Sequence, residues 1–235
     1  MFAVQNAWAV TYSSANAPQL SLVELYTSEG CSSCPPADKK MSDFTRDKGL
    51  WDSFVPIAFH VDYWDRLGWK DKYANSSFAD RQREYANLWQ SKYTYTPGFV
   101  VSGLEWDRWR NQARPKKTSM NKGVLTATDI GPYEFNVSYD QPLEQGHSWK
   151  AHAVLMGFNY DSPIRAGENR GKKLRHDFVA LDLKHKIMLK KNSYFEARFK
   201  LNVPPNLETD KYAVVFWIES SELQKPIQVT GGYYG

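Results

Sequence analysis

Apolar and polar positions follow two different patterns along the chain, and the change falls near residue 118. Before that point, continuous apolar runs typical of buried strands alternate with stretches that have helical spacing and a proline or a capping residue at the start. The expected strands are 20–26, 54–61 and 99–102, and the expected helices are about 34–48 and 77–92. This alternating order of strands and helices predicts an α/β unit.

After residue 118, short runs of alternating apolar and polar residues are separated by turn residues such as Gly131-Pro132 and Pro204-Pro205. The runs are 124–130, 133–139, 149–158, 178–183, 195–201 and 212–219. Several short strands with few helical signals predict an all-β, sandwich-like domain. We therefore expect an α/β domain at 19–117, followed by the all-β domain at 118–235.

The first residues have an unusual composition for a folded domain. Residues 1–23 contain no charged side chain, and Ala7-Trp8-Ala9 has the small-x-small form of a signal-peptidase site. Two interpretations are open for 1–18, a flexible tail and the remnant of a signal peptide. The second would place the protein in the periplasm or outside the cell, because signal peptides direct export.

The composition is that of an ordinary globular protein with many aromatic side chains. Hydrophobic residues make up 42% of the 235 residues and charged residues 24%. The formal net charge of +4 is too small to predict nucleic-acid binding. No apolar run reaches the ~20 residues that a membrane helix needs. We expect neither a nucleic-acid partner nor a membrane span.

The two cysteines, Cys31 and Cys34, form one C-x-x-C motif between an expected strand and an expected helix. Two cysteines exclude a disulfide-rich scaffold and a four-cysteine zinc site. At a helix start, free N–H groups and the helix dipole favour a thiolate, so the pKa of Cys31 should lie below the ordinary ~8.5. We expect Cys31 to be the attacking thiol, within reach of solvent, and Cys34 to be the resolving thiol.

Thr96-Pro97 directly precedes the third expected strand. Together with the strand, the C-x-x-C motif and the helix, this placement resembles the thioredoxin-like superfamily, in which a cis-proline before that strand faces the redox pair. The resemblance implies a cis Thr96–Pro97 bond, a Thr96 backbone beside the bound substrate, and a Pro97 that keeps both sulfurs accessible. It also implies a thioredoxin-like fold for the α/β domain.

A narrower resemblance rests on motifs that are spread over most of the chain. They are ELYTSEGCSSCPPAD at 24–38, HVDYWD at 60–65, YTP at 95–97, and GENRG at 167–171 with Leu174 and His176. With these motifs the chain resembles the bacterial secreted family catalogued as domain of unknown function 1223. That family implies a thioredoxin-like N-terminal domain with a β-rich C-terminal extension, and it implies no established substrate.

Polar and aromatic residues near the expected strand ends are candidates for substrate binding. Asp62, Tyr63 and Trp64 follow the second strand, where open α/β sheets place binding sites, and Tyr95 precedes the Thr96-Pro97 pair. The alternative is a buried aromatic plug whose carboxylates cap local N–H groups. The loop 62–74 is longer than in a minimal thioredoxin, and it is a candidate to cover the site and narrow its substrates.

Two further features are open to a functional and a structural interpretation. Glu24 lies in an otherwise apolar strand and is a candidate proton acceptor for the resolving thiol. Alternatively, it lies on a half-exposed face or pairs with a base. A second polar cluster is either a loop that folds against the redox site or a solvated charged turn. Its members are Glu168, Asn169, Arg170 and His176.

The motifs together predict a thiol–disulfide oxidoreductase that exchanges disulfides with an unknown exported protein or a small thiol. The reaction would pass through a mixed disulfide at Cys31 that Cys34 resolves. The main alternative is a binding module without catalysis. In that alternative the two cysteines form a structural disulfide, which braces a cleft lined by Trp64, Trp69 and Tyr95.

A third interpretation is Cu(I) handling, because two thiolates suit a soft ion. His60 ends a strand and offers a further nitrogen. A lone histidine in that place is more typical of a packed or hydrogen-bonded residue than of a ligand. We therefore expect no cofactor and no resident metal.

Overall fold

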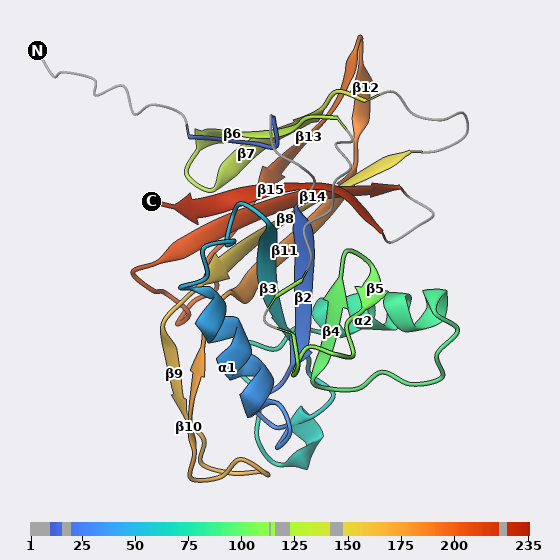
Figure 1. Ribbon diagram of the computed structural model, residues 1–235. Helices are drawn as coiled ribbons and strands as arrows, with labels where there is room; N and C mark the ends of the chain where they lie inside the picture. The colour runs from blue at the N-terminus through green and yellow to red at the C-terminus, as the bar shows by residue number, and fades with distance from the viewer. Residues whose placement is uncertain (1–9, 16–19, 113, 116–122, 142–147, 221–224) are drawn as a thin grey trace, which may run out of the picture.

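The computed structural model describes residues 10–15, 20–112, 114–115, 123–141, 148–220 and 225–235. Within these residues, the centre of the molecule is an eight-stranded sheet with the order β15-β14-β8-β11-β3-β2-β4-β5 (Figure 1). Its strands are β2 (Ser21–Thr27), β3 (Phe54–His60), β4 (Gly98–Val101), β5 (Leu104–Glu105), β8 (Trp149–Gly157), β11 (Val179–Ile187), β14 (Tyr212–Ser220) and β15 (Pro226–Tyr234). Strand β3 runs parallel to both β2 and β11, and the other neighbours are antiparallel.

A five-stranded sheet packs against the β14 side of this sheet and closes a second apolar core. Its order is β1-β6-β7-β13-β12. Its strands are β1 (Thr11–Ser13), β6 (Leu125–Gly131), β7 (Glu134–Tyr139), β12 (Leu189–Lys191) and β13 (Tyr194–Lys200). Buried and half-buried residues alternate along β7, which is the pattern of a strand with one face in a core. Phe135 of β7 meets Phe216 of β14 with ring centroids 5.0 Å apart.

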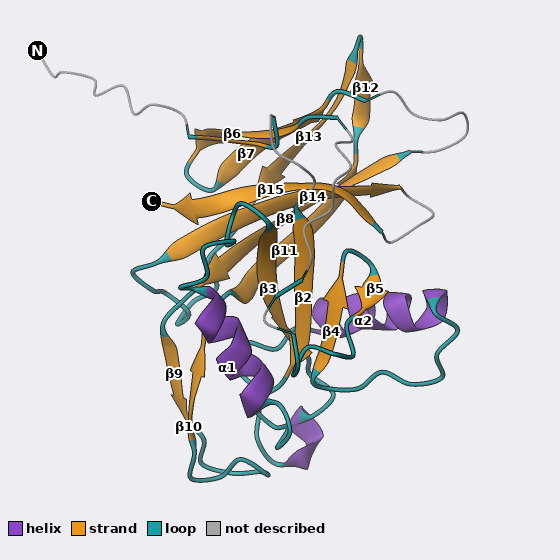
Figure 2. Ribbon diagram, in the orientation of Figure 1, coloured by secondary structure: helices purple, strands orange, loops and turns teal. Residues whose placement is uncertain are grey.

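The helices α1 (Pro35–Phe44) and α2 (Ser76–Leu88) cover opposite faces of the central strands (Figure 2). Thr27 of β2 is hydrogen-bonded to Asp38 of α1, whereas Glu24 of the same strand is bonded to Arg81 of α2. Because side chains alternate across a strand, these contacts place the two helices on different faces. This explains why β2 is buried along its whole length.

A two-stranded hairpin, β9 (Tyr160–Pro163) and β10 (Lys173–His176), runs beside α1 (Figure 1). It follows β8 and precedes β11, so the chain leaves the large sheet and returns to it. The apolar pattern of the sequence does not predict this hairpin or strand β15. The hairpin matters for the site because its connecting loop contacts the C-x-x-C segment.

The expected fold class is wrong: the chain does not adopt an α/β thioredoxin-like fold followed by an all-β sandwich. In the described residues the molecule is mostly β, with fifteen strands and two α-helices. Strands from after residue 118 continue the sheet that contains β2, β3 and β4, through the pairing of Val179 with Ala58. The reason is that a buried strand needs hydrogen-bonding neighbours on both sides. An apolar pattern identifies such a strand but not its neighbours.

The expected boundary between 19–117 and 118–235 falls within residues 116–122, which lie outside the described residues. Residues 1–9 and 16–18 of the expected N-terminal segment also lie outside the described residues. Residues Thr11–Ser13 of that segment form β1 and pair with β6. In the described part of the chain, neither helix is long and apolar enough to cross a membrane.

Candidate functional site

The C-x-x-C segment connects the end of β2 to the start of α1, as the sequence predicts. The Cys31 N–H donates to the Ser28 carbonyl over 3.1 Å, and the Cys34 N–H donates to the Cys31 carbonyl over 3.2 Å. Cys34 is the N-cap of α1, and Pro35 and Pro36 occupy its first positions, where a backbone N–H is not needed. The two tight turns bring both cysteines to the amino end of the helix.

The surroundings of Cys31 lower the pKa of its thiol to about 6. The largest cause is a hydrogen bond from the Cys34 thiol, and burial acts in the opposite direction. Ser33 contributes its backbone N–H and its hydroxyl, whose oxygen lies 3.3 Å from Cys31 Sγ. Cys31 is therefore mostly a thiolate at neutral pH, which is the form that attacks disulfides. The sequence predicts a lowered pKa from the start of the helix, but it does not single out the hydrogen bonds from Cys34 and Ser33 as the causes.

Cys34 shows the opposite behaviour. Burial raises the pKa of Cys34 well above its ordinary value, and the hydrogen bond to Cys31 and the nearby Asp38 carboxylate raise it further. Cys34 therefore stays a thiol and keeps donating to the Cys31 sulfur. This division into one thiolate and one thiol suits an attacking and a resolving cysteine.

Thr96 and Pro97 lie against the cysteine pair, although 63 residues separate Thr96 from Ser33. The Thr96–Pro97 peptide bond is cis, as expected from its place before the third strand, and Pro97 is buried. The Thr96 carbonyl oxygen lies 3.7 Å from Cys31 Sγ, and the Ser33 hydroxyl donates to it over 3.4 Å. The structure thus brings the four predicted redox-site residues together.

The expected solvent access of Cys31 is wrong, because both cysteines are 0% exposed. Ser32 and Ser33, which lie between them, are exposed. Trp64 covers the turn before Cys31: a Cβ at Gly30 would come within 3.1 Å of the Trp64 Cβ. The 62–74 loop is therefore part of the cover, as its length indicates. Residues next to the C-x-x-C motif determine the turn and the start of the helix, whereas residues far from it in sequence determine how exposed Cys31 is.

The tip of the β9–β10 hairpin forms another part of the cover. Asn169 is 0% exposed, and its Nδ2 donates to the carbonyls of Glu29 and Cys31 over 2.8 and 2.9 Å. The Glu168 carboxylate accepts the Ser32 N–H over 3.1 Å. For Asn169 and Glu168, the structure therefore agrees with the interpretation of a loop that folds against the C-x-x-C segment.

Replacing Asn169 with alanine should make Cys31 reactive more often. The change removes the donor of the buried Glu29 carbonyl and one of the two donors of the Cys31 carbonyl, which keeps the Cys34 N–H. A buried carbonyl without a donor costs about 1–3 kcal/mol, so the closed contact weakens. We expect alkylation of Cys31 by iodoacetamide to accelerate roughly tenfold or more, since local opening controls access to a buried group. Arg170→Ala is the matched control, because Arg170 is exposed on the same loop. Equal rates in both variants and the unchanged protein would contradict the covering role of the hairpin.

A cluster of buried acidic and histidine side chains lies next to the C-x-x-C turn. Its members are Glu29, Asp38, His60, Asp71 and His176. His60 Nδ1 lies 2.7 Å from Asp71 Oδ2, which also accepts the Glu29 N–H over 2.8 Å. His176 Nε2 lies 3.3 Å from Glu29 Oε1, and the rings of His60 and His176 are 4.9 Å apart. The cluster connects β2, β3, the 62–74 loop and the hairpin.

Opposite charges keep part of this cluster ionised despite its burial. Burial alone would lower the pKa of His60, but the nearby carboxylates, Asp71 above all, raise it to about 9. Burial alone would raise the pKa of Asp71, but the charge of His60 and its hydrogen bond outweigh burial and lower this pKa. Burial raises the pKa of Asp38, whose Oδ1 accepts the Thr27 hydroxyl over 2.8 Å. The sequence does not single out Asp38 or Asp71 as site residues, because nothing in the neighbouring residues shows that these carboxylates are buried.

Glu24 does not take part in this site. Its carboxylate accepts Arg81 Nε over 2.6 Å, and the hydroxyls of Tyr26 and Tyr85 donate to it over 3.0 and 2.6 Å. Glu24 faces α2, whereas Cys34 begins α1 on the other face of the sheet. The geometry gives the expected proton transfer from Cys34 to Glu24 no support, and the alternative of a pairing with a base is confirmed.

The candidate substrate-binding residues lie in different surroundings. Burial and then the neighbouring Cys34 raise the pKa of Tyr63, whose hydroxyl donates to Gln82 Oε1 over 3.1 Å. Trp64 is half-buried in the cover of the cysteines, and Asp62 is half-buried beside it. Tyr95 is 51% exposed and lines a pocket.

Trp69 and His60 are the residues that the other two interpretations of the cysteine pair add to the site. Trp69 is half-buried, and its Nε1 donates to Glu29 Oε2 over 2.8 Å, so its indole nitrogen faces the buried cluster. The described residues contain no group of three or more His, Cys, Asp or Glu side chains that would hold a metal ion. His60 is packed and hydrogen-bonded, as its place at a strand end predicts.

Comparisons with known proteins give a family and a fold. Residues 22–219 match the profile of a family described as "Protein of unknown function (DUF1223)". No curated protein matches the chain in sequence. A crystal structure of a protein from Agrobacterium tumefaciens is similar with 22% identity and a TM-score of 0.59, over 93% of this chain and 95% of that one. HBP35 of Porphyromonas gingivalis is similar with 12% identity and a TM-score of 0.55, over 92% of this chain and 75% of that one. At these identities the two structures show a shared fold.

Proposed function

The family match covers most of the sequence, so the chain belongs to the DUF1223 family, and we propose that this member is a thiol–disulfide oxidoreductase that acts through Cys31 and Cys34. The observation that supports the proposal is the difference in acidity within the pair. The pKa of Cys31 is lowered to about 6 by the hydrogen bond from Cys34 and by its other partners. Burial first of all raises the pKa of Cys34. Such a pair combines a nucleophilic thiolate, Cys31, with a neighbouring protonated thiol, Cys34.

The proposed exchange conserves electrons without a cofactor. The Cys31 thiolate attacks one sulfur of a substrate disulfide, the other substrate sulfur leaves as a thiolate, and a mixed disulfide forms at Cys31. Cys34 then attacks the Cys31 sulfur, and the bond between Cys31 and the substrate breaks. The departing substrate sulfur takes up the Cys34 proton and leaves as a thiol, and a Cys31–Cys34 disulfide remains. The two electrons of the dithiol have then reduced the substrate. The reverse sequence oxidises a substrate dithiol.

Because Cys31 is buried in the folded protein, exchange requires a local movement that lets a substrate sulfur reach it. The substrate sulfur must approach past Thr96, Ser33 and the hairpin tip, because these groups lie around the Cys31 sulfur and carbonyl. Ser32 and Ser33 are already exposed, so the shift that uncovers the sulfur is local. We propose an exported protein or a small thiol as the partner and the periplasm or the cell exterior as the location, because disulfides persist in those compartments.

The trapping of a mixed disulfide tests the proposal. Cys34→Ser should accumulate one covalent adduct with a synthetic peptide disulfide, because the serine hydroxyl still donates to Cys31 but cannot resolve the adduct. Cys31→Ser should form none, since Cys34 is buried and protonated. Intact-mass spectrometry at pH 7 counts the adducts. Negligible adducts in both variants, with no oxidation of the unchanged protein by the same peptide, would contradict the proposal.

The burial of both sulfurs favours one competing function, a binding module whose cysteines form a structural disulfide. Thiol titration separates the two. A catalytic pair exchanges with a mild reductant and reforms with a mild oxidant within minutes, whereas a structural disulfide resists the mild reductant in the folded protein.

A further inference from the structure

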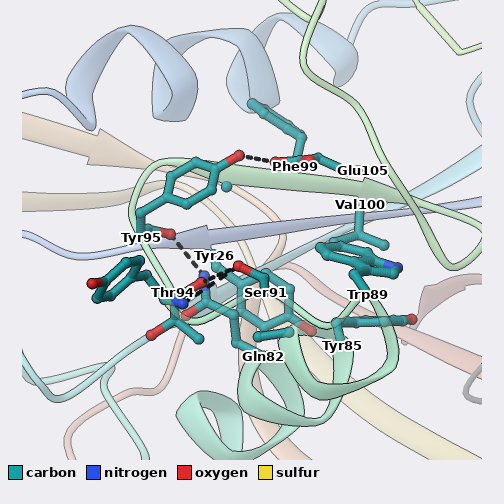
Figure 3. A pocket seen from close by; sticks show the side chains of 13 residues that line it. Tyr26, Gln82, Tyr85, Trp89, Ser91, Thr94, Tyr95, Phe99, Val100 and Glu105 are labelled. Carbon is teal, nitrogen blue, oxygen red and sulfur yellow. Dashed lines mark hydrogen bonds between the residues drawn. The ribbon is translucent and has the colours of Figure 1, made fainter.

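A pocket of about 170 Å³ opens between α2 and the segment that leads into β4 (Figure 3). Tyr85 and Trp89 form one wall, and their rings are stacked with centroids 5.4 Å apart and an interplanar angle of 17°. Phe99 and Val100 of β4 line the same pocket. A lining of aromatic and aliphatic side chains is typical of a site for an apolar group.

Several of the aromatic side chains at this pocket are exposed. Trp89, Tyr93 and Tyr95 line it and have 36%, 78% and 51% of their surface exposed. Tyr95 and Trp89 lie on opposite sides of the pocket (Figure 3). Exposed aromatic groups around a hollow are typical of a site that becomes covered when a partner binds.

The pocket lies next to the proposed redox site along the chain and in space. Gln82 of α2 donates from Nε2 to the Tyr95 carbonyl over 2.7 Å and accepts the Tyr63 hydroxyl at Oε1. Tyr95 is followed by Thr96, whose carbonyl oxygen is 3.7 Å from Cys31 Sγ. Because consecutive Cα atoms are ~3.8 Å apart, a polypeptide bound at Cys31 reaches the pocket within a few residues.

We propose that this pocket binds one aromatic side chain of the substrate protein, a few residues from the cysteine that forms the mixed disulfide with Cys31. The inference rests on the proposed function and adds a substrate class to it. An apolar cavity of ~150 Å³ holds one benzene molecule, so the volume of about 170 Å³ fits a single ring. The stacked wall of Tyr85 and Trp89 favours a planar group, since aromatic rings gain from offset-stacked or edge contacts. Glu105 lines the pocket, accepts the Tyr95 hydroxyl, and disfavours an acidic side chain there.

A set of cysteine hexapeptides tests the pocket. Each peptide carries its cysteine as a mixed disulfide with 5-thio-2-nitrobenzoate, and the release of the coloured thiolate by the reduced protein gives the second-order rate of exchange. Phenylalanine is placed one, two or three residues to either side of the cysteine, with alanine, lysine and glutamate peptides for comparison. We expect at least one phenylalanine position to exchange about tenfold faster than alanine, as burial of a benzyl group allows.

A pocket-filling variant shows where the preference arises. Ala86 lines the pocket and is 8% exposed, so Ala86→Leu fills part of it with a residue that favours a helix. The ratio of the phenylalanine rate to the alanine rate should fall to about one in this variant. Asn87→Leu is the matched control, because Asn87 is exposed on the same helix and does not line this pocket.

The outcomes separate this inference from the proposed function. If the alanine peptide exchanges and no phenylalanine position is faster, or if lysine is preferred, the aromatic site is overturned and the oxidoreductase proposal stands. If no peptide exchanges, the oxidoreductase proposal fails. A peptide with serine in place of cysteine then gives a second measurement by calorimetry: binding that needs phenylalanine would show a pocket with no role in exchange, and the substrate assignment would be overturned with the proposed function.

Discussion

Replacing Arg81 with methionine should lower the free energy of unfolding by about 3–5 kcal/mol, because the change leaves the buried Glu24 carboxylate without its cation. Arg81 is 4% exposed and bonds Glu24 through Nε over 2.6 Å and through Nη2 over 3.1 Å. The guanidinium also lies 3.8 Å from a Glu219 oxygen, and both carboxylates are 0% exposed. Urea denaturation, followed by tryptophan fluorescence and by circular dichroism, measures the loss.

Arg83→Met is the control for this experiment. Arg83 lies on the same helix and pairs with Asp80, but both side chains are more than half exposed. An exposed pair contributes about 0–1 kcal/mol, so the control should change little. A loss below about 1 kcal/mol for Arg81→Met would mean that water or a rearrangement satisfies Glu24 and would contradict this account of the sheet interior. The site should keep its geometry in either variant, because Arg81 and the cysteines lie on different faces of β2.

The parts of the site that depend on neighbouring residues are predictable from the sequence. The turn at Cys31, the helix that begins after Cys34, and the low pKa of Cys31 all follow from a strand, two cysteines and two prolines in close succession. The approach of Thr96 to Cys31 is also predictable, but only through the resemblance to a known arrangement. Glu24 shows the limit of this reasoning, since its spacing from Cys31 does not state which face of the strand it takes.

The parts that depend on distant residues are not predictable from one sequence. Asn169 is 138 positions from Cys31, and no local pattern indicates that it binds that carbonyl. The burial of Cys31 also depends on distant residues, because the loop between β9 and β10 packs over it. Likewise, strands from the second half of the chain pair with strands from the first half in one sheet. Apolar residues at every second position predict a strand, but the tertiary structure determines which strand pairs with it. The error in fold class therefore concerns which strands pair, while the strands before residue 118 are found close to their expected places.

Asp71→Asn should cost about 3–5 kcal/mol near pH 6, and the cost should shrink as the pH rises. His60 and Asp71 are both fully buried side chains with a 2.7 Å contact, and the Asp71 carboxylate also holds the Glu29 N–H at the C-x-x-C turn. The folded pKa of His60, about 9 where the carboxylates outweigh burial, lies above the ordinary value of 6.5. The charged histidine therefore adds stability that is fully present below pH 6.5 and is lost as the pH rises through about 9. The shift corresponds to roughly 3 kcal/mol at about 1.4 kcal/mol per pKa unit.

The difference between the two proteins, measured from pH 6 to 9.5, is the informative quantity. Cys31 changes stability with the opposite sign over part of this range, because its hydrogen bonds lower its pKa to about 6 in the folded state and the thiolate favours folding as the pH rises. Subtracting the variant from the unchanged protein removes most of that contribution, since both retain Cys31. A destabilisation that stays constant from pH 6 to 9.5 would show that His60 is neutral in the folded protein and that Asp71 acts only as a hydrogen-bond acceptor. A destabilisation that decreases by roughly 3 kcal/mol would show that a buried ion pair supports the turn on which Cys31 lies.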